Sequence, residues 1–193
     1  FLLLYITNCF IDNITPFLHS SFWKTPLPKN DKLLQKYWNE QPSSIIIINF
    51  NNSIILGHET TGTLNNANNN TAIGINSLDA ITSGDGNTAF GLSSLTALTT
   101  GNYNSAQGAY SLRDNTSGSY NVAMGNSSLR DMTEGLKNSA LGQGSAFRVT
   151  TGDFNVGLGY RSGDTITVGN NNVIVGGFAD ASKNDASNQI VIG

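Results

Sequence analysis

The feature that most constrains this chain is a glycine that returns at a constant 17-residue spacing along most of its length. Glycine makes up 21 of the 193 residues, about one in nine, so eight successive steps on one spacing are not a chance arrangement. A fixed period of this length is typical of a solenoid, in which each repeat is one coil stacked on the coil before it. The nine glycines are Gly57, Gly74, Gly91, Gly108, Gly125, Gly142, Gly159, Gly176 and Gly193.

The repeat divides the chain into two regions. Residues 1–50 carry no repeat and hold both tryptophans and all four prolines. In this region Asp31 is placed to cap a short helix over residues 31–40, and residues 43–50, with four consecutive isoleucines, predict a strand. Because such a strand would aggregate if exposed, we expect it to be covered by the solenoid, as its first rung, or by another subunit. Residues 51–193 form the repeat domain, which we expect to continue beyond Gly193 in the native protein.

Asparagine stands four residues before the repeat glycine in seven successive coils. Stacked asparagine amides form hydrogen-bonded ladders, and asparagine also tolerates the left-handed backbone that a corner requires. The column therefore predicts a structural ladder along the stack. Its members are Asn70, Asn87, Asn104, Asn121, Asn138, Asn155 and Asn172.

The segment between this asparagine and the glycine predicts a short strand with two apolar faces. Small residues such as Ala72 and Ala89 are expected to face a narrow interior, and the large residues that follow them, such as Ile73 and Phe90, point the other way. A coil this short has no second core to cover that outward face. Small cores also need help to be stable, so we expect assembly with further copies, most simply as a trimer.

The rest of each coil carries a second apolar column, seen at Ile81 and Leu98, followed by a threonine-rich turn with a second glycine. This pattern predicts a second short strand and a second corner in each coil. The aromatic residues Tyr103, Tyr120 and Phe154 are expected to stack from coil to coil.

The pattern N-x-A-x-G-x-x-S-L-x-x-x-T-T-G, over residues 53–193, resembles the YadA-like head repeats of trimeric autotransporter adhesins and the repeat regions of phage and large-virus tail-fibre proteins. The coil here is longer than the YadA-like repeat by a turn that contains leucine, which is closer to the fibre variety. The resemblance implies an all-β, left-handed parallel β-roll with three chains side by side. It further implies a non-enzymatic attachment module, extracellular at a cell surface or on a virion fibre, with a host surface protein or glycan as receptor.

Composition narrows the possible functions. Charged residues are 12% of the chain and the net charge is −3, which argues against a nucleic-acid partner. The single cysteine, Cys9, forms no intrachain disulfide, and His19 and His58 stand in no metal-binding spacing. No run of 18 apolar residues occurs, so we expect no membrane insertion by this segment. We expect no metal, no cofactor and no catalytic residues.

Side chains that vary between coils are the candidates for surface contacts. The simpler interpretation makes each a solvated corner residue that keeps the rod soluble, in which case the module is a purely structural spacer of a virion tail fibre. The candidates are Asp79, Arg113, Asp114, Arg130, Asp131 and Arg148.

Two further classes of function stay open as weaker alternatives. A threonine column, for example Thr99 and Thr116, is a feature of ice-binding solenoids, but its neighbouring threonines are adjacent in sequence and so point to opposite faces. A β-solenoid enzyme that cleaves glycans needs paired carboxylates. Asp114 and Asp131 lie one coil apart, but a charge-balanced corner with the neighbouring arginines is the simpler interpretation.

Overall fold

The computed structural model describes residues 47–50, 53–56 and 67–193. The expected helix over residues 31–40, the start of the expected strand at residues 43–46, and Gly57 lie outside the described residues. Residues 41–193 form one compact unit, which contains every strand described.

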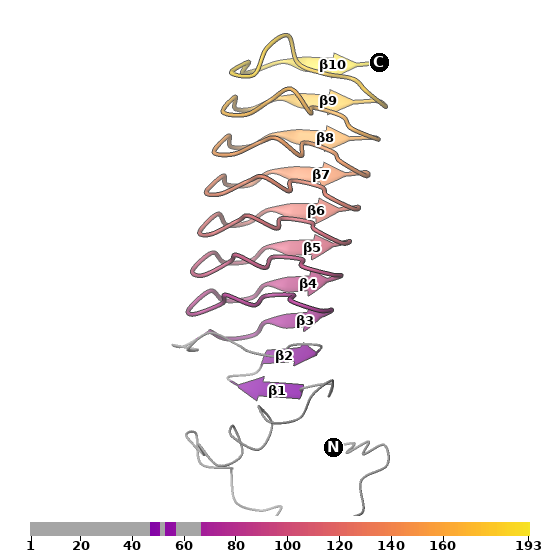
Figure 1. The fold of residues 1–193 in the computed structure, drawn as a ribbon. Coiled ribbons are helices and arrows are strands. Elements are labelled where there is room, and N and C mark those ends of the chain that lie inside the picture. The colour runs from indigo at the N-terminus through magenta and orange to yellow at the C-terminus, as the bar shows by residue number, and fades with distance from the viewer. Residues whose placement is uncertain (1–46, 51–52, 57–66) are drawn as a thin grey trace, which may run out of the picture. The chain divides into compact units, whose positions relative to one another are not determined.

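Ten strands form a single sheet in the order of the sequence (Figure 1). From β2 onward each strand pairs in parallel with the next, and the register moves by one full coil at every step, as in Ala72 opposite Ala89. The sequence prediction of a parallel β-solenoid with 17-residue coils is therefore confirmed. The strands are β1 (Ile47–Phe50), β2 (Ser53–Leu56), β3 (Thr71–Ile73), β4 (Thr88–Phe90), β5 (Ser105–Gln107), β6 (Val122–Met124), β7 (Ser139–Leu141), β8 (Val156–Leu158), β9 (Val173–Val175) and β10 (Ile190–Ile192).

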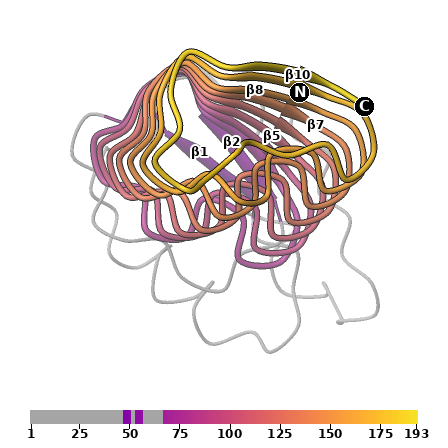
Figure 2. The same ribbon diagram turned by 90° about the horizontal axis from the view of Figure 1, so that it is seen from above.

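The coils wind in the left-handed sense. Seen from the C-terminal end, the chain runs clockwise around each coil while it advances toward the viewer (Figure 2). No helix occurs among the described residues.

The isoleucine-rich strand β1 is the first rung of the sheet, as expected, but its direction is reversed. Ile48 lies opposite Ile55 in an antiparallel pair, whereas β2 and β3 are parallel. Only two residues separate β1 from β2, which is the length of a tight hairpin and far too short for a parallel crossover.

The expected second strand of each coil is absent from the described coils, and that prediction was wrong. Each of these coils has one three-residue strand, and the remainder is a series of turns. The turns still stack, because backbone amides bond to the next coil, as when Thr82 N donates to Thr99 O at 3.0 Å. The threonine hydroxyls do the same, and Thr99 Oγ1 donates to Thr116 O at 2.9 Å.

The interior is a thin column of small and medium side chains. The strand alanines, including Ala89, are fully buried, as is the second apolar column that contains Leu98. Opposite the alanines lies a serine column, in which Ser128 Oγ donates to Ala140 O at 3.1 Å. Leu112 and the leucines at equivalent positions are also fully buried, with φ angles of about 50°, a left-handed backbone that is rare for leucine. Burial of the leucine side chain therefore offsets the backbone strain.

The asparagine ladder is confirmed. Asn121 Nδ2 donates to Asn104 Oδ1 at 3.1 Å and to Gly135 O at 2.8 Å. Its Oδ1 accepts from the backbone N and the Nδ2 of Asn138. The amide is fully buried and every hydrogen-bonding group on it is used.

The sequence suggested that the left-handed corner would fall on these asparagines, but the structure places it elsewhere. It falls on the residue before each of them, such as Tyr103, Tyr120, Lys137 and Phe154, with φ of 55–61°. At this corner Tyr103 and Tyr120 stack with ring centroids 5.3 Å apart, as predicted. Phe154 instead lies under the ammonium group of Lys137, at 5.0 Å.

The repeat glycines are required twice over. From Gly74 to Gly176 their φ angles are 129–141°, which residues with a Cβ can adopt only with backbone strain. A Cβ on Gly108 would also lie 2.6 Å from the carbonyl carbon and oxygen of Gly125. The glycine column thus allows both the corner and the close approach of neighbouring coils.

Candidate functional site

The outward side of the strands is an exposed apolar face. In β3 the middle residue Ala72 is buried, whereas Ile73 is 44% exposed. The same alternation repeats in each strand through β8, because successive strand residues point to opposite sides. We define the apolar strand face by its exposed large residues, Ile73, Phe90, Val122, Met124, Leu141, Val156 and Leu158.

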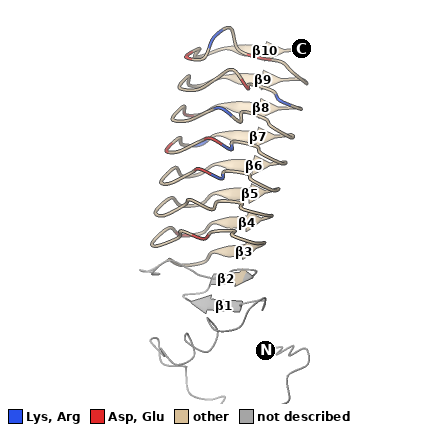
Figure 3. Cartoon of the chain, viewed as in Figure 1, with Lys and Arg blue, Asp and Glu red and all other residues tan. Residues whose placement is uncertain are grey.

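Four of the six predicted contact residues form a charge ladder on the turns of the middle coils, where Figure 3 shows adjacent basic and acidic positions. Arg113 pairs with Asp114 through Nε and Nη2, both at 2.7 Å. One coil on, Arg130 pairs with Asp131 at 2.6 and 3.1 Å. The charge-balanced corner expected from the sequence is therefore confirmed, and each of the two carboxylates already binds its own guanidinium.

These pairs stabilise the charged form of both arginines. The hydrogen bond to Asp114 raises the pKa of Arg113, and the hydrogen bond to Asp131 raises the pKa of Arg130. Asp79, at the equivalent of Arg113 two coils earlier, is half-buried.

Arg148, the last of the predicted contact residues, belongs to a cluster that the sequence did not predict. Its guanidinium lies 5.2 Å from the ring centroid of Phe147, and those of Arg130 and Arg161 lie at 5.0 and 5.6 Å from the same ring. Arg161 pairs with Asp164, whose hydrogen bond raises the pKa of Arg161. Arg148 makes no ion pair with any carboxylate in the described part of the chain.

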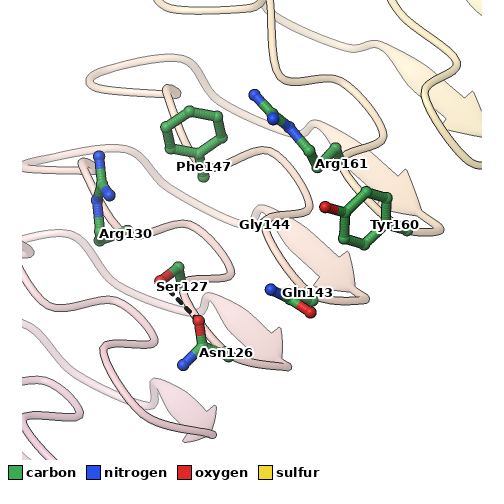
Figure 4. Close-up of a pocket in the computed structure, with 8 residues that line it drawn as sticks. All are labelled: Asn126, Ser127, Arg130, Gln143, Gly144, Phe147, Tyr160 and Arg161. Atoms are coloured by element: carbon green, nitrogen blue, oxygen red, sulfur yellow. Dashed lines mark hydrogen bonds between the residues drawn. The ribbon is translucent and has the colours of Figure 1, made fainter.

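A shallow hollow of about 220 Å³ opens beside this cluster (Figure 4). Its lining comes from the same three positions of successive coils, because equivalent residues of neighbouring coils lie above one another. In Figure 4 the Tyr160 hydroxyl and the Gln143 amide turn toward Gly144, and the Phe147 ring lies between the two arginines. The lining residues are Asn126, Ser127, Arg130, Gln143, Gly144, Phe147, Tyr160 and Arg161.

Gly144 lines the hollow and has no side chain to fill it. Its φ of 64° is shared by its column neighbours Ser93, Tyr110, Ser127 and Arg161, all at 51–60°, so the backbone does not demand glycine there. A Cβ on Gly144 would meet only Cγ of Arg161, at 3.3 Å. The sequence signal was the segment 143–147, QGSAF, where the repeat elsewhere has residues such as NSSLR.

No group of three or more His, Cys, Asp or Glu side chains that could hold a metal ion is found among residues 47–50, 53–56 and 67–193. Within the same residues, no helix is long and apolar enough to cross a membrane.

Comparisons with protein-family models, with curated protein sequences and with solved structures found no significant match to this chain.

Proposed function

We propose that the repeat domain is a non-enzymatic, surface-exposed trimeric fibre or adhesin head that attaches its carrier to host cells or surfaces. The observation that carries the proposal is the apolar strand face, which a single chain leaves in water. Phe90, Met124 and Leu158 are 37–42% exposed in alternate layers of one sheet. Large apolar side chains exposed together on one face are typical of an interaction site.

A second and a third copy of the same chain are the partners we propose for that face. The coils from β3 to β8 carry an apolar residue at the same outward position, with Gln107 of β5 as the exception, so identical rods side by side would match one another along most of their length. Assembly would also widen the thin core, since each copy adds large side chains to a common axis. A trimer presents three copies of each exposed turn, and avidity then strengthens individually weak contacts with a receptor.

The oligomeric state tests this proposal. We expect the 193-residue chain to be a trimer by multi-angle light scattering. Substitution of Met124 and Leu141 together by lysine should give smaller species, since charges would have to be buried at the axis. Leu136→Lys is the matched control, because Leu136 is 40% exposed but lies on a turn outside the strands. A well-folded wild-type monomer would refute the trimer.

A purely structural spacer is the second candidate, and the charge ladder favours it. Arg113 and Asp114 engage one another and do not line the hollow, so neither is well placed to bind a receptor. Retention of cultured host cells on a surface coated with the chain distinguishes an attachment head from a structural spacer. A spacer would be trimeric and would not retain cells, whereas a head would do both.

A further inference from the structure

We propose that the hollow at Gly144 binds one carboxylated sugar, a uronate or a sialate unit. The inference rests on the proposed function, because it names the class of receptor group that an attachment module would bind. The backbone does not require glycine at position 144. The column holds serine at 93 and 127 and arginine at 161 with similar backbone angles, so the missing side chain leaves a recess that the fold does not need.

The chemistry of the lining favours an anionic ligand. None of the eight residues that line the hollow is acidic, and two are arginines. Around Phe147 three guanidiniums, of Arg130, Arg148 and Arg161, face two paired carboxylates, of Asp131 and Asp164, which leaves a surplus of one positive charge. This surplus occurs in a chain whose net charge is −3.

The arginines retain hydrogen-bonding capacity for such a ligand. The ion pairs of Arg130 and Arg161 use Nε and Nη2, so Nη1 of each guanidinium is not used by them. Arginine is the side chain best suited to a carboxylate, because its planar donors match the two carboxylate oxygens.

The rest of the lining favours a sugar over a small inorganic anion or an acidic peptide. The amides of Gln143 and Asn126 both donate and accept, which suits a ring bearing several hydroxyls. The Ser127 hydroxyl donates to Asn126 Oδ1 at 3.0 Å and keeps its lone pairs as acceptors (Figure 4). Tyr160 is 45% exposed and adds an aromatic ring and a hydroxyl. The volume of about 220 Å³ is below the ~300–1,000 Å³ of pockets for drug-sized ligands, which fits a single ring. A peptide would need an extended groove or a free strand edge.

The position of the hollow also sets it apart from the apolar strand face. Ile75 and Leu92 occupy the equivalents of Asn126 and Gln143 in earlier coils. The column thus changes from apolar to amide side chains where the hollow begins, and Gln143 is exposed. This change points to a ligand rich in hydroxyls at that level of the stack.

Saturation-transfer-difference NMR on the 193-residue chain tests the inference, with methyl β-glucuronide, methyl α-sialoside and, as the neutral probe, methyl β-glucoside. We expect transfer to at least one acidic sugar and none to the glucoside. Arg130→Gln and Gly144→Ser should each weaken that binding by about tenfold or more, the scale of one hydrogen bond to a charged group. Gly144→Ser is expected to fold, since serine occupies this column at 93 and 127 with φ of 52–56°.

Arg113→Gln is the matched control, because Arg113 makes the same ion pair one coil earlier and does not line the hollow. The inference would be overturned if the glucoside bound as well as the acidic sugars, or if neither acidic sugar showed transfer. It would also be overturned if an acidic peptide, added as a fourth probe, were the only ligand to bind, or if Arg113→Gln and Arg130→Gln lost binding equally. Light scattering is run in parallel. A monomer that binds the glucuronide supports this inference and refutes the trimer, whereas a trimer that binds no acidic sugar overturns this inference alone.

Discussion

A single methyl group on a repeat glycine in the middle of the stack should break the contact between two coils. In Gly108→Ala the new Cβ would lie 2.6 Å from the carbonyl carbon and oxygen of Gly125 and 3.0 Å from the amide nitrogen of Asn126. All three are backbone atoms, so no side chain can rotate away. The φ of 133° adds strain, because residues other than glycine rarely adopt it.

The magnitude is the sum of two costs. Holding alanine in this backbone region costs about 1–3 kcal/mol. Overpacking against a fixed neighbour costs a further ~1–3 kcal/mol. We therefore expect Gly108→Ala to lower the free energy of unfolding by about 2–6 kcal/mol, a large part of the ~5–15 kcal/mol that typical domains possess.

Urea unfolding followed by circular dichroism, at one fixed protomer concentration, measures this loss. Gly177→Ala is the matched control, since a Cβ there would meet nothing closer than Tyr160 O at 3.9 Å, and its φ is not in the left-handed region. We expect its effect to stay within about 0.5 kcal/mol. If Gly108→Ala costs no more than Gly177→Ala, the glycine column is not needed for close stacking and the reasoning is wrong.

Three further predictions concern the other columns. Asn121→Ala should cost about 3 kcal/mol or more, because the buried Gly135 O and Asn138 N lose their partner and Asn104 Oδ1 keeps only the backbone N of residue 121. Urea unfolding measures this cost, and a loss below that of Asn126→Ala on the surface would contradict the ladder. Asn121→Asp should lose stability relative to wild type as the pH rises from about 4 to 8, because burial among acceptors raises the pKa of the new carboxyl group in the folded state above its unfolded value near 3.9. Thermal melts across that pH range measure the loss, and the exposed Asn126→Asp should show no such difference. Asn115→Leu should lower the free energy of unfolding by no more than about 1–3 kcal/mol, because the buried Gly118 N loses its acceptor. The new apolar side chain offsets part of this cost, since Leu98 and Met132 fill the equivalent positions. A cost above that figure in urea unfolding would contradict this account.

The sequence predicted the features that depend on one position recurring once in every coil. The coil length, the parallel register and the asparagine ladder all follow from columns of identical side chains, because each residue contacts its own equivalent in the next coil. Asn115 breaks its column in sequence, yet it closes its own turn, and so leaves the stack unchanged.

The features that were missed depend on backbone geometry or on differences between coils. A second apolar column predicts a strand and a buried turn equally well, so Ile81 and Leu98 could not separate them. The left-handed corner fell on Tyr103 and Tyr120 because stacking between coils determines the backbone more strongly than residue preference does. The hollow was not predicted because its lining comes from three successive coils, and Arg130, Gly144 and Tyr160 form no motif within any one of them.

The register between strands restricts how this chain can change in length. Every strand from β3 to β9 pairs with the equivalent residues of the coil on each side. An insertion into the stacked part of a coil that is not a whole number of coils would place an alanine opposite a corner, whereas a duplicated coil would keep every contact and add about 4.8 Å to the stack. In the gene, one coil corresponds to a whole number of codons, so its gain or loss keeps the reading frame. Unequal recombination between repeats could therefore lengthen or shorten the rod in whole coils while every remaining interface is preserved.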